Sequence, residues 1–197
     1  MKPYYAVFLV CGLLLAGAHT AHAQEGPEKG GNELEIWAGG GHDSNGIITR
    51  TGMVNTGLRY GWILTELHGP SILRGQFEYA VDAVPMFLVF QPGGTAYGAG
   101  VVPLGLIWDF QRRGNVVPYI EISSGPLFTS TDVPAGASRF NFMDSMALGF
   151  HFLTKKLTWT ADVRFLHVSD AGITNPNPGI NTVQVRIGVG WFTHGRR

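Results

Sequence analysis

The sequence has little charge, almost no cysteine and no Lys/Arg cluster. Charged residues make up 14% of its 197 residues, where about a quarter is usual for soluble domains. The 14 basic side chains are balanced by 14 acidic ones, so no basic face is available to the phosphates of a nucleic acid. The 45% apolar content argues against intrinsic disorder. We therefore expect one modest folded domain with no nucleic-acid partner.

The N-terminal segment is typical of a secretion signal. The apolar run from Ala6 to Ala18 is shorter than the roughly 20 residues that a membrane-spanning helix needs. Ala21-His22-Ala23 then supplies a small-residue cleavage site. The single Cys11 lies within this signal, so the exported chain has neither a disulfide nor a thiol nucleophile. The predicted divisions are a signal peptide at 1–23, a polar lead-in at 24–31 and the folded domain at 32–197.

Helical periodicity is also absent, and alternation with a period of two residues takes its place. The alternation is clearest near the C-terminus, where Val183, Val185 and Ile187 share one face and Gln184 and Arg186 share the other. The same pattern predicts eight strands, near residues 33–41, 54–64, 73–89, 96–110, 116–129, 140–152, 157–165 and 183–191. The fold class is therefore all-β.

The distribution of charge predicts which face of these strands is inside. Charged residues of both signs fall on the less apolar face of the strands, at Arg59, Arg74, Glu78, Asp82, Asp109, Glu121, Asp162, Arg164 and Arg186. Aromatic and long apolar side chains cover the other face. A barrel with its apolar face toward lipid accounts for both, because eight strands leave a lumen filled by side chains and closure leaves no strand edge in lipid. We predict an eight-stranded antiparallel transmembrane β-barrel of the bacterial outer membrane.

The predicted connections and tryptophans agree with this topology. With the N-terminus in the periplasm, loops near 42–50, 91–95, 130–138 and 170–181 are extracellular, and short turns near 65–71, 111–115 and 154–156 are periplasmic. The five tryptophans lie near strand ends and are expected to form interfacial girdles, although simple packing explains some of them as well. They are Trp37, Trp62, Trp108, Trp159 and Trp191.

One polar pair interrupts the lipid-facing pattern. His167 and Ser169 continue the row of Val163 and Phe165, because residues two apart on a strand share a side. A histidine within reach of a serine hydroxyl can accept its proton and make it a nucleophile. Spacing alone is unspecific, since such a pair also occurs at the membrane boundary without catalytic work.

The segment from Arg164 to Phe192 resembles the active-site region of the lipid A 3-O-deacylase family of outer-membrane enzymes. The resemblance rests on His167-x-Ser169, then Ala171-Gly172 and a Pro/Asn-rich turn into the final alternating strand. It implies a serine carboxylic ester hydrolase that removes the ester-linked acyl chain at position 3 of lipid A. By resemblance, Ser169 is the nucleophile and His167 the base.

Two positions depart from the family pattern. Members of the family pair the catalytic histidine with a Glu, and the matching position here is Asn181. The Asn that follows the nucleophile in the family is Asp170 here. An amide can orient an imidazole but does not stabilise the imidazolium as a carboxylate does. The oxyanion donors would be backbone N–H groups from Asp170 to Gly172, where a nearby carboxylate opposes developing negative charge.

Asp144 also interrupts a lipid-facing row. A two-residue turn at Lys155-Lys156 would place Asp144 opposite His167 on the neighbouring strand. We hypothesise that its carboxylate replaces the missing Glu. A register shift of one pair would move it to a diagonal position instead.

The expected partners are the membrane and lipopolysaccharide of its outer leaflet, and the oligomeric state stays open. Arg139 and Arg50, in or beside extracellular loops, are candidates for lipid A phosphates, although ordinary loop charges explain them as well. No cofactor or metal is required by the dyad, and the histidines at 42, 68, 151 and 194 are scattered in sequence. Calcium is left open.

Two alternative functions remain at this stage. A non-catalytic small barrel with structural, adhesive or narrow-pore duties would retain His167 and Ser169 as interfacial residues or as an inactive site. A soluble eight-stranded ligand carrier would place its apolar face inside instead of outside.

Overall fold

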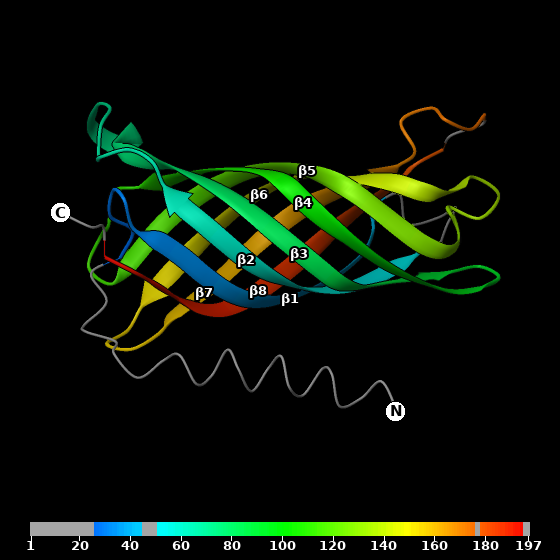
Figure 1. Cartoon of the computed structure of the whole chain (residues 1–197), viewed down its shortest axis with the longest axis horizontal. Helices are drawn as coiled ribbons and strands as arrows, with labels where there is room; N and C mark the ends of the chain where they lie inside the picture. The colour runs from blue at the N-terminus through cyan, green and yellow to red at the C-terminus, as the bar shows by residue number, and fades with distance from the viewer. Residues whose placement is uncertain (1–25, 45–50, 176–177, 195–197) are drawn as a thin grey trace.

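The computed structural model describes residues 26–44, 51–175 and 178–194. Eight antiparallel strands, each bonded to its sequence neighbours, close into a barrel through pairing of the first with the last (Figure 1). The strands are β1 (Asn32–Asp43), β2 (Gly52–Ile63), β3 (Gly75–Gln91), β4 (Gly94–Phe110), β5 (Val116–Val133), β6 (Ser138–Leu153), β7 (Thr158–Ser169) and β8 (Ile180–Phe192). The predicted all-β barrel is confirmed. The predicted signal peptide and Arg50 lie outside the described residues.

The strands of the barrel differ in length, and the longer ones extend further at one end. We call the end where β1 begins and β8 ends the terminal end, and the opposite one, where β7 ends at Ser169, the loop end. Strands β3 to β6 have 16 to 18 residues, whereas β1, β2, β7 and β8 have 12 or 13. About 9 to 11 residues suffice to cross a bilayer. The middle strands therefore extend further, and the β5–β6 hairpin continues beyond the level of Ser169.

Two prolines, Pro85 and Pro103, lie where the ladder is interrupted. The β3–β4 register shifts between Val84 and Phe87, around Pro85, and the β4–β5 register shifts between Gly100 and Leu104, around Pro103. Because proline has no N–H to donate to a neighbouring strand, it is tolerated at such bulges. These bulges also help the long strands to curve into a closed barrel.

Side chains alternate between an apolar outer face and a polar interior. On β8, Val185 and Ile187 are 58% and 60% exposed, whereas Arg186 between them is 2% exposed. An exposed apolar surface around the whole barrel is unfavourable in water and favourable in lipid. The soluble-carrier alternative is therefore wrong, because this protein carries its apolar face outside.

The middle of the lumen is filled by an ion-pair network. The Arg59 guanidinium donates to Asp82 and Glu121 at 2.9 Å, and Arg164 reaches Glu121 at 3.0 Å. Arg186 donates from Nε to Asp162 at 2.7 Å. Such pairs offset the desolvation of the buried charges only when their geometry is good.

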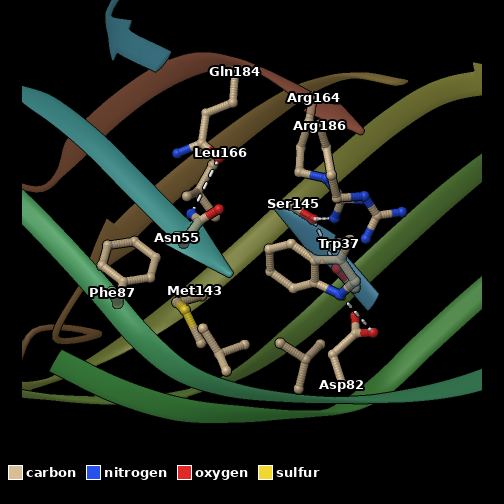
Figure 2. A pocket seen from close by; sticks show the side chains of 13 residues that line it. Trp37, Asn55, Asp82, Phe87, Met143, Ser145, Arg164, Leu166, Gln184 and Arg186 are labelled. Carbon is tan, nitrogen blue, oxygen red and sulfur yellow. Dashed lines mark hydrogen bonds between the residues drawn. The ribbon is translucent and has the colours of Figure 1, made fainter. Parts of the chain in front are cut away.

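A small cavity lies beside this network. Its volume is about 30 Å³, and its lining includes Trp37, Phe87 and Met143 as well as Arg164 (Figure 2). The cavity is far too small for a lipid.

Several details differ from the predictions. Trp37 does not belong to a girdle: it is 7% exposed inside the barrel, where its indole N–H donates to Asp82 and the Arg186 guanidinium lies over its ring. The four other tryptophans lie on the outer face near the terminal end, at Trp62, Trp108, Trp159 and Trp191. Arg74 is exposed just before β3, at the end of a 3₁₀ turn (Ser71–Leu73), and not in the lumen. Among the described residues, no helix has the length and apolar character to cross a membrane.

Candidate active site

The site residues occupy one level of the barrel near the loop end. Register pairs Ser124 on β5 with Asp144 on β6, Asp144 with His167 on β7, and His167 with Asn181 on β8. The predicted pairing of Asp144 with His167 is thus present. The row crosses four neighbouring strands and faces the same side as the lipid-exposed Met146 and Val183. The row forms a polar band where the apolar outer surface ends, near the loop end.

His167 is oriented by Asn181. Its Nδ1 lies 2.7 Å from the Asn181 Oδ1, and the imidazole is half-buried. An amide oxygen only accepts hydrogen bonds, so the imidazole proton resides on Nδ1 and Nε2 keeps a free lone pair. The backbone of Asn181 is itself fixed, since its carbonyl accepts a 2.9 Å hydrogen bond from the Ser44 N–H.

Asp144 has a different partner. Its Oδ1 accepts a hydrogen bond from the Ser124 hydroxyl at 2.6 Å, and its side chain is exposed. No hydrogen bond joins the described side chains of Asp144 and His167. The carboxylate is therefore a neighbour of the imidazole, one strand away, and not its hydrogen-bond partner.

Ser169 lies on the same face as His167 and is covered by Gly179. A Cβ placed on Gly179 would lie 2.8 Å from His167 Cε1, 3.4 Å from His167 Nε2 and 3.5 Å from Ser169 Cβ. The imidazole edge that carries Nε2 and the serine therefore converge on one point. Gly179 has φ +59°, a conformation that glycine adopts without steric cost. Ser169 is 9% exposed, and no hydrogen bond joins its hydroxyl to His167 among the described contacts.

The segment after Ser169 is a tight turn organised by Asp170. The carboxylate accepts hydrogen bonds from the Gly172 N–H at 3.0 Å, the Thr174 N–H at 2.9 Å and the Thr174 hydroxyl. The hydroxyl of Thr174, followed by these backbone N–H groups, lowers the pKa of Asp170 from its ordinary value. Asp170 thus holds the turn as a carboxylate.

This turn changes the set of available oxyanion donors. The Gly172 N–H is already bonded to Asp170. The N–H groups of Asp170 and Ala171 donate to no acceptor among the described residues. Ala171 has φ +55°, an unusual backbone conformation for a residue with a Cβ. These two N–H groups, next to Ser169 in the chain, are therefore the free donors of the turn.

Two further predicted residues lie away from this row. Arg139 is exposed in the β5–β6 hairpin and faces Asp132, with 3.6 Å between its Nε and the carboxylate. This contact favours the ordinary loop charge over a phosphate ligand. Arg50 lies outside the described residues.

A second cluster of polar side chains lies in the lumen and was not predicted from sequence. One ligand atom from each of Glu33, Glu35 and His151 lies within 4.8 Å of the others, a group that the scattered sequence positions of the histidines did not reveal. Alternation placed His151 on the inner face, but sequence carries no measure of distance across a barrel.

Comparison with known proteins identifies the family. A model of the family described as "Lipid A 3-O-deacylase (PagL)" matches residues 54–190, more than half of the chain. The chain belongs to the lipid A 3-O-deacylase family. His167, Ser169 and Asn181 lie within the matched range.

Individual relatives agree with this assignment. The lipid A deacylase PagL of Bordetella bronchiseptica strain RB50 is 34% identical over 96 residues, which are 47% of this chain and 49% of that protein. The chain thus aligns with about half the length of this curated relative.

Solved structures show the same fold. The outer-membrane enzyme PagL superposes with a TM-score of 0.59 at 19% identity, covering 78% of this chain and 97% of that one. OprG from Pseudomonas aeruginosa gives 0.55 at 12% identity, covering 86% and 98%. Family membership and the apolar outer surface place the protein in the bacterial outer membrane.

Proposed function

We propose that this protein is an outer-membrane esterase that removes the 3-O-linked acyl chain of lipid A by a Ser-His mechanism. The carrying observation is the outward-facing His167, held through Nδ1 by Asn181, with Ser169 two residues further along the same face. Membership of the lipid A 3-O-deacylase family supplies the substrate class. The proposed substrate is lipopolysaccharide of the outer leaflet.

The chemistry follows from the free lone pair on His167. Nε2 accepts the Ser169 hydroxyl proton as Oγ bonds to the ester carbonyl carbon. The tetrahedral intermediate then expels the sugar oxygen, which receives that proton from the imidazolium. A water molecule repeats both steps on the acyl-serine, so the products are a free fatty acid and a 3-hydroxyl on the sugar, with Ser169 restored.

The intermediate needs hydrogen-bond donors for its oxyanion. The N–H groups of Asp170 and Ala171 are free and adjoin Ser169, which is the arrangement that stabilises an oxyanion. Gly172 contributes by closing the turn, because its own N–H is held by Asp170. The Asp170 carboxylate is occupied by three donors, which moderates its repulsion of the developing charge.

Two residues act on His167 when it becomes positively charged. Asn181 holds the ring through Nδ1 but carries no charge. Asp144 carries a charge and lies on the neighbouring strand opposite His167. We infer that Asn181 orients the base and that Asp144 stabilises the imidazolium through space. This division predicts slower turnover than a site with one bonded carboxylate.

The acyl chain has a path along the outer wall. An apolar hollow of about 710 Å³ runs across β3 to β7 and includes Phe165, which precedes His167 by two residues on the same face. Its outward-facing lining also includes Ile122, Met146 and Val163. An acyl chain lying in this hollow would remain in the lipid layer while its ester reaches Ser169.

The test is the mass of lipid A from cells that produce the protein. We expect a decrease equal to one ester-linked acyl chain together with a matching free fatty acid. Ser169→Ala and His167→Ala should each lower this activity by about a thousandfold or more. Ser130→Ala and His42→Ala, which change a serine and a histidine elsewhere near the loop end, serve as matched controls and should keep it.

The non-catalytic barrel remains the competing hypothesis. It is favoured by Asn181 in the family's Glu position and by the missing hydrogen bond between Ser169 and His167. Apo sites often form that bond only with substrate in place. Unchanged lipid A in cells with a correctly inserted wild-type barrel would reject the esterase and favour this alternative.

A further inference from the structure

A second group of functional side chains lies inside the barrel near the terminal end. Glu33 and Glu35 on β1 and His151 on β6 bring one ligand atom each to within 4.8 Å of one another. Glu33 Oε1 lies 3.6 Å from the His151 Nδ1. All three residues are at least 96% buried. Two carboxylates and one imidazole form a mixed oxygen and nitrogen donor set.

Two other carboxylates, Asp109 and Glu78, point toward this group and accept no hydrogen bond. Asp109 Oδ1 lies 3.5 Å from the His151 Nε2, and neither Asp109 oxygen has a hydrogen bond. Glu78 occupies the space over Gly61, next to the Cβ of Glu33, and both its oxygens are also unpaired. Asp109 and Glu78 are fully buried. Buried polar atoms are normally hydrogen-bonded, so the two Glu78 oxygens and the second Asp109 oxygen are available to a positive partner.

The neighbouring arginines do not supply that partner. Arg59, the Cα partner of Glu35, is directed to Asp82 and Glu121 and has one nitrogen, Nη1, without a bond. Arg164 and Arg186 bind Asp162 and Glu121. Carboxyl groups outnumber guanidinium groups among the described buried lumen residues. The eight carboxyls are Glu33, Glu35, Asp43, Glu78, Asp82, Asp109, Glu121 and Asp162, against Arg59, Arg164 and Arg186.

Aromatic and apolar side chains pack around this group. The His151 ring stacks on Tyr119 at 4.5 Å between centroids and meets the edge of Phe192 at 5.3 Å. Ile63, Val117, Leu153 and Phe192 form an apolar layer in this part of the barrel. Gly188 leaves the room that the Glu35 carboxylate fills, since a Cβ there would lie 2.5 Å from Glu35 Cδ. A cation held here would be shielded from competing water.

We propose that the lumen binds one divalent cation of the Zn²⁺ class through Glu33, Glu35 and His151, with Asp109 and Glu78 beside it. An imidazole in the donor set selects first-row metals over calcium or magnesium, which prefer oxygen alone. The ion would neutralise the excess carboxylates and join β1 to β6 across the barrel. Because the apolar layer restricts entry, the ion binds as the barrel folds.

The experiment measures metal retained by the folded barrel. The full mature chain without a polyhistidine tag is unfolded in urea with a chelator, refolded in detergent with Zn²⁺ or Ca²⁺ alone, and dialysed against metal-free buffer. We expect about one Zn²⁺ per barrel, an X-ray absorption spectrum with an imidazole ligand, and a higher melting temperature than that of the metal-free barrel. Calcium should be lost.

Variants separate this site from the protein surface. His151→Gln and Glu35→Gln should each weaken Zn²⁺ binding by at least about tenfold. The double variant His68→Gln, His194→Gln removes exposed histidines of the same end and should bind Zn²⁺ like the wild type. If the lumen variants do not fold, the wild-type absorption spectrum and the surface variant still decide.

Several results would overturn the proposal. These are wild-type barrel that keeps no Zn²⁺ after dialysis, a spectrum without imidazole, loss of the metal in the surface double variant, or retention of Ca²⁺ and not Zn²⁺. The measurement is independent of lipid A hydrolysis.

Discussion

Asp144 and His167 face each other across β6 and β7, yet the Asp144 carboxylate takes its hydrogen bond from Ser124 on the far side. The imidazole takes its own from Asn181. In the proposed mechanism, the Asp144 carboxylate therefore acts on the base by its charge and not through a hydrogen bond. This arrangement makes the roles of the two residues separable by substitution.

Asp144→Asn removes the charge and keeps the shape of the side chain. We expect kcat for lipid A hydrolysis to fall by about tenfold, equivalent to about 1.4 kcal/mol of lost imidazolium stabilisation, with KM unchanged. Asn181→Ala frees the ring and should cost more. Asn181→Glu should raise turnover above the wild type. Activity of Asp144→Asn within twofold of wild type, with Asn181→Ala inactive, would show that Asp144 has no part in catalysis.

Gly179→Ala should uncouple the site without unfolding the barrel. The new Cβ would meet His167 Cε1 at 2.8 Å in a residue with φ +59°, so the imidazole must leave Asn181 or the loop must move. We expect hydrolysis to fall by about a hundredfold, as misplacement of about 1 Å can cause. Gly136→Ala is the matched control, because Gly136 also has a positive φ but has no atom within 4 Å of its would-be Cβ. Equal activity of the two variants would contradict the role assigned to Gly179.

The turn after Ser169 should depend on the ionisation of Asp170. Hydrogen bonds from the Thr174 hydroxyl and from backbone N–H groups lower the pKa of Asp170. The stabilisation is therefore present above the ordinary value of about 3.9 and is lost as the pH falls through the lowered value. Thr174→Val removes the largest cause and should move the titration of the Asp170 carboxyl upward. Carbon-13 NMR of the labelled carboxyl measures this shift, and an unchanged titration would refute it.

Arg186→Leu should destabilise the barrel from within. It leaves Asp162 and Glu121 short of a buried partner, and breaking such a pair costs about 3 to 5 kcal/mol. Urea unfolding in lipid vesicles measures the loss. Lys29→Ala provides the comparison, since the Lys29–Glu66 pair is exposed and should contribute about 1 kcal/mol at most. Similar losses for the two variants would mean that the network contributes little.

Alternation predicted the fold because it depends only on local sequence. Alternation predicted where the strands lie, that their apolar face is outside and that His167 points outward. The short turn at Lys155-Lys156 predicted that Asp144 pairs with His167. Alternation also held a signal that was missed: Trp37 shares its parity with Glu33 and Glu35, and so belongs inside. Strand ends were less certain, since β5 continues to Val133, beyond the predicted end at Thr129.

Relationships across the barrel were beyond local sequence. The meeting of His151 with Glu33 depends on how the strands tilt and close, which sets which inner residues share a level. The approach of Gly179 to His167 depends on the path of a loop that returns over the strand. The hydrogen bond from the Gly172 N–H to the Asp170 carboxylate could likewise be seen only in the folded turn.

The unequal strand lengths would give the proposed esterase a preferred direction of substrate approach in the plane of the membrane. His167 lies on the short strand β7, between the longer strand β6 and the short strand β8. On one side of His167 the β5–β6 hairpin extends beyond the level of the site. On the other side, the strands β8 and β1 are shorter. A lipid with a bulky sugar headgroup would therefore approach from the side of β8 and β1. Its acyl chains would move laterally and stay within the outer leaflet.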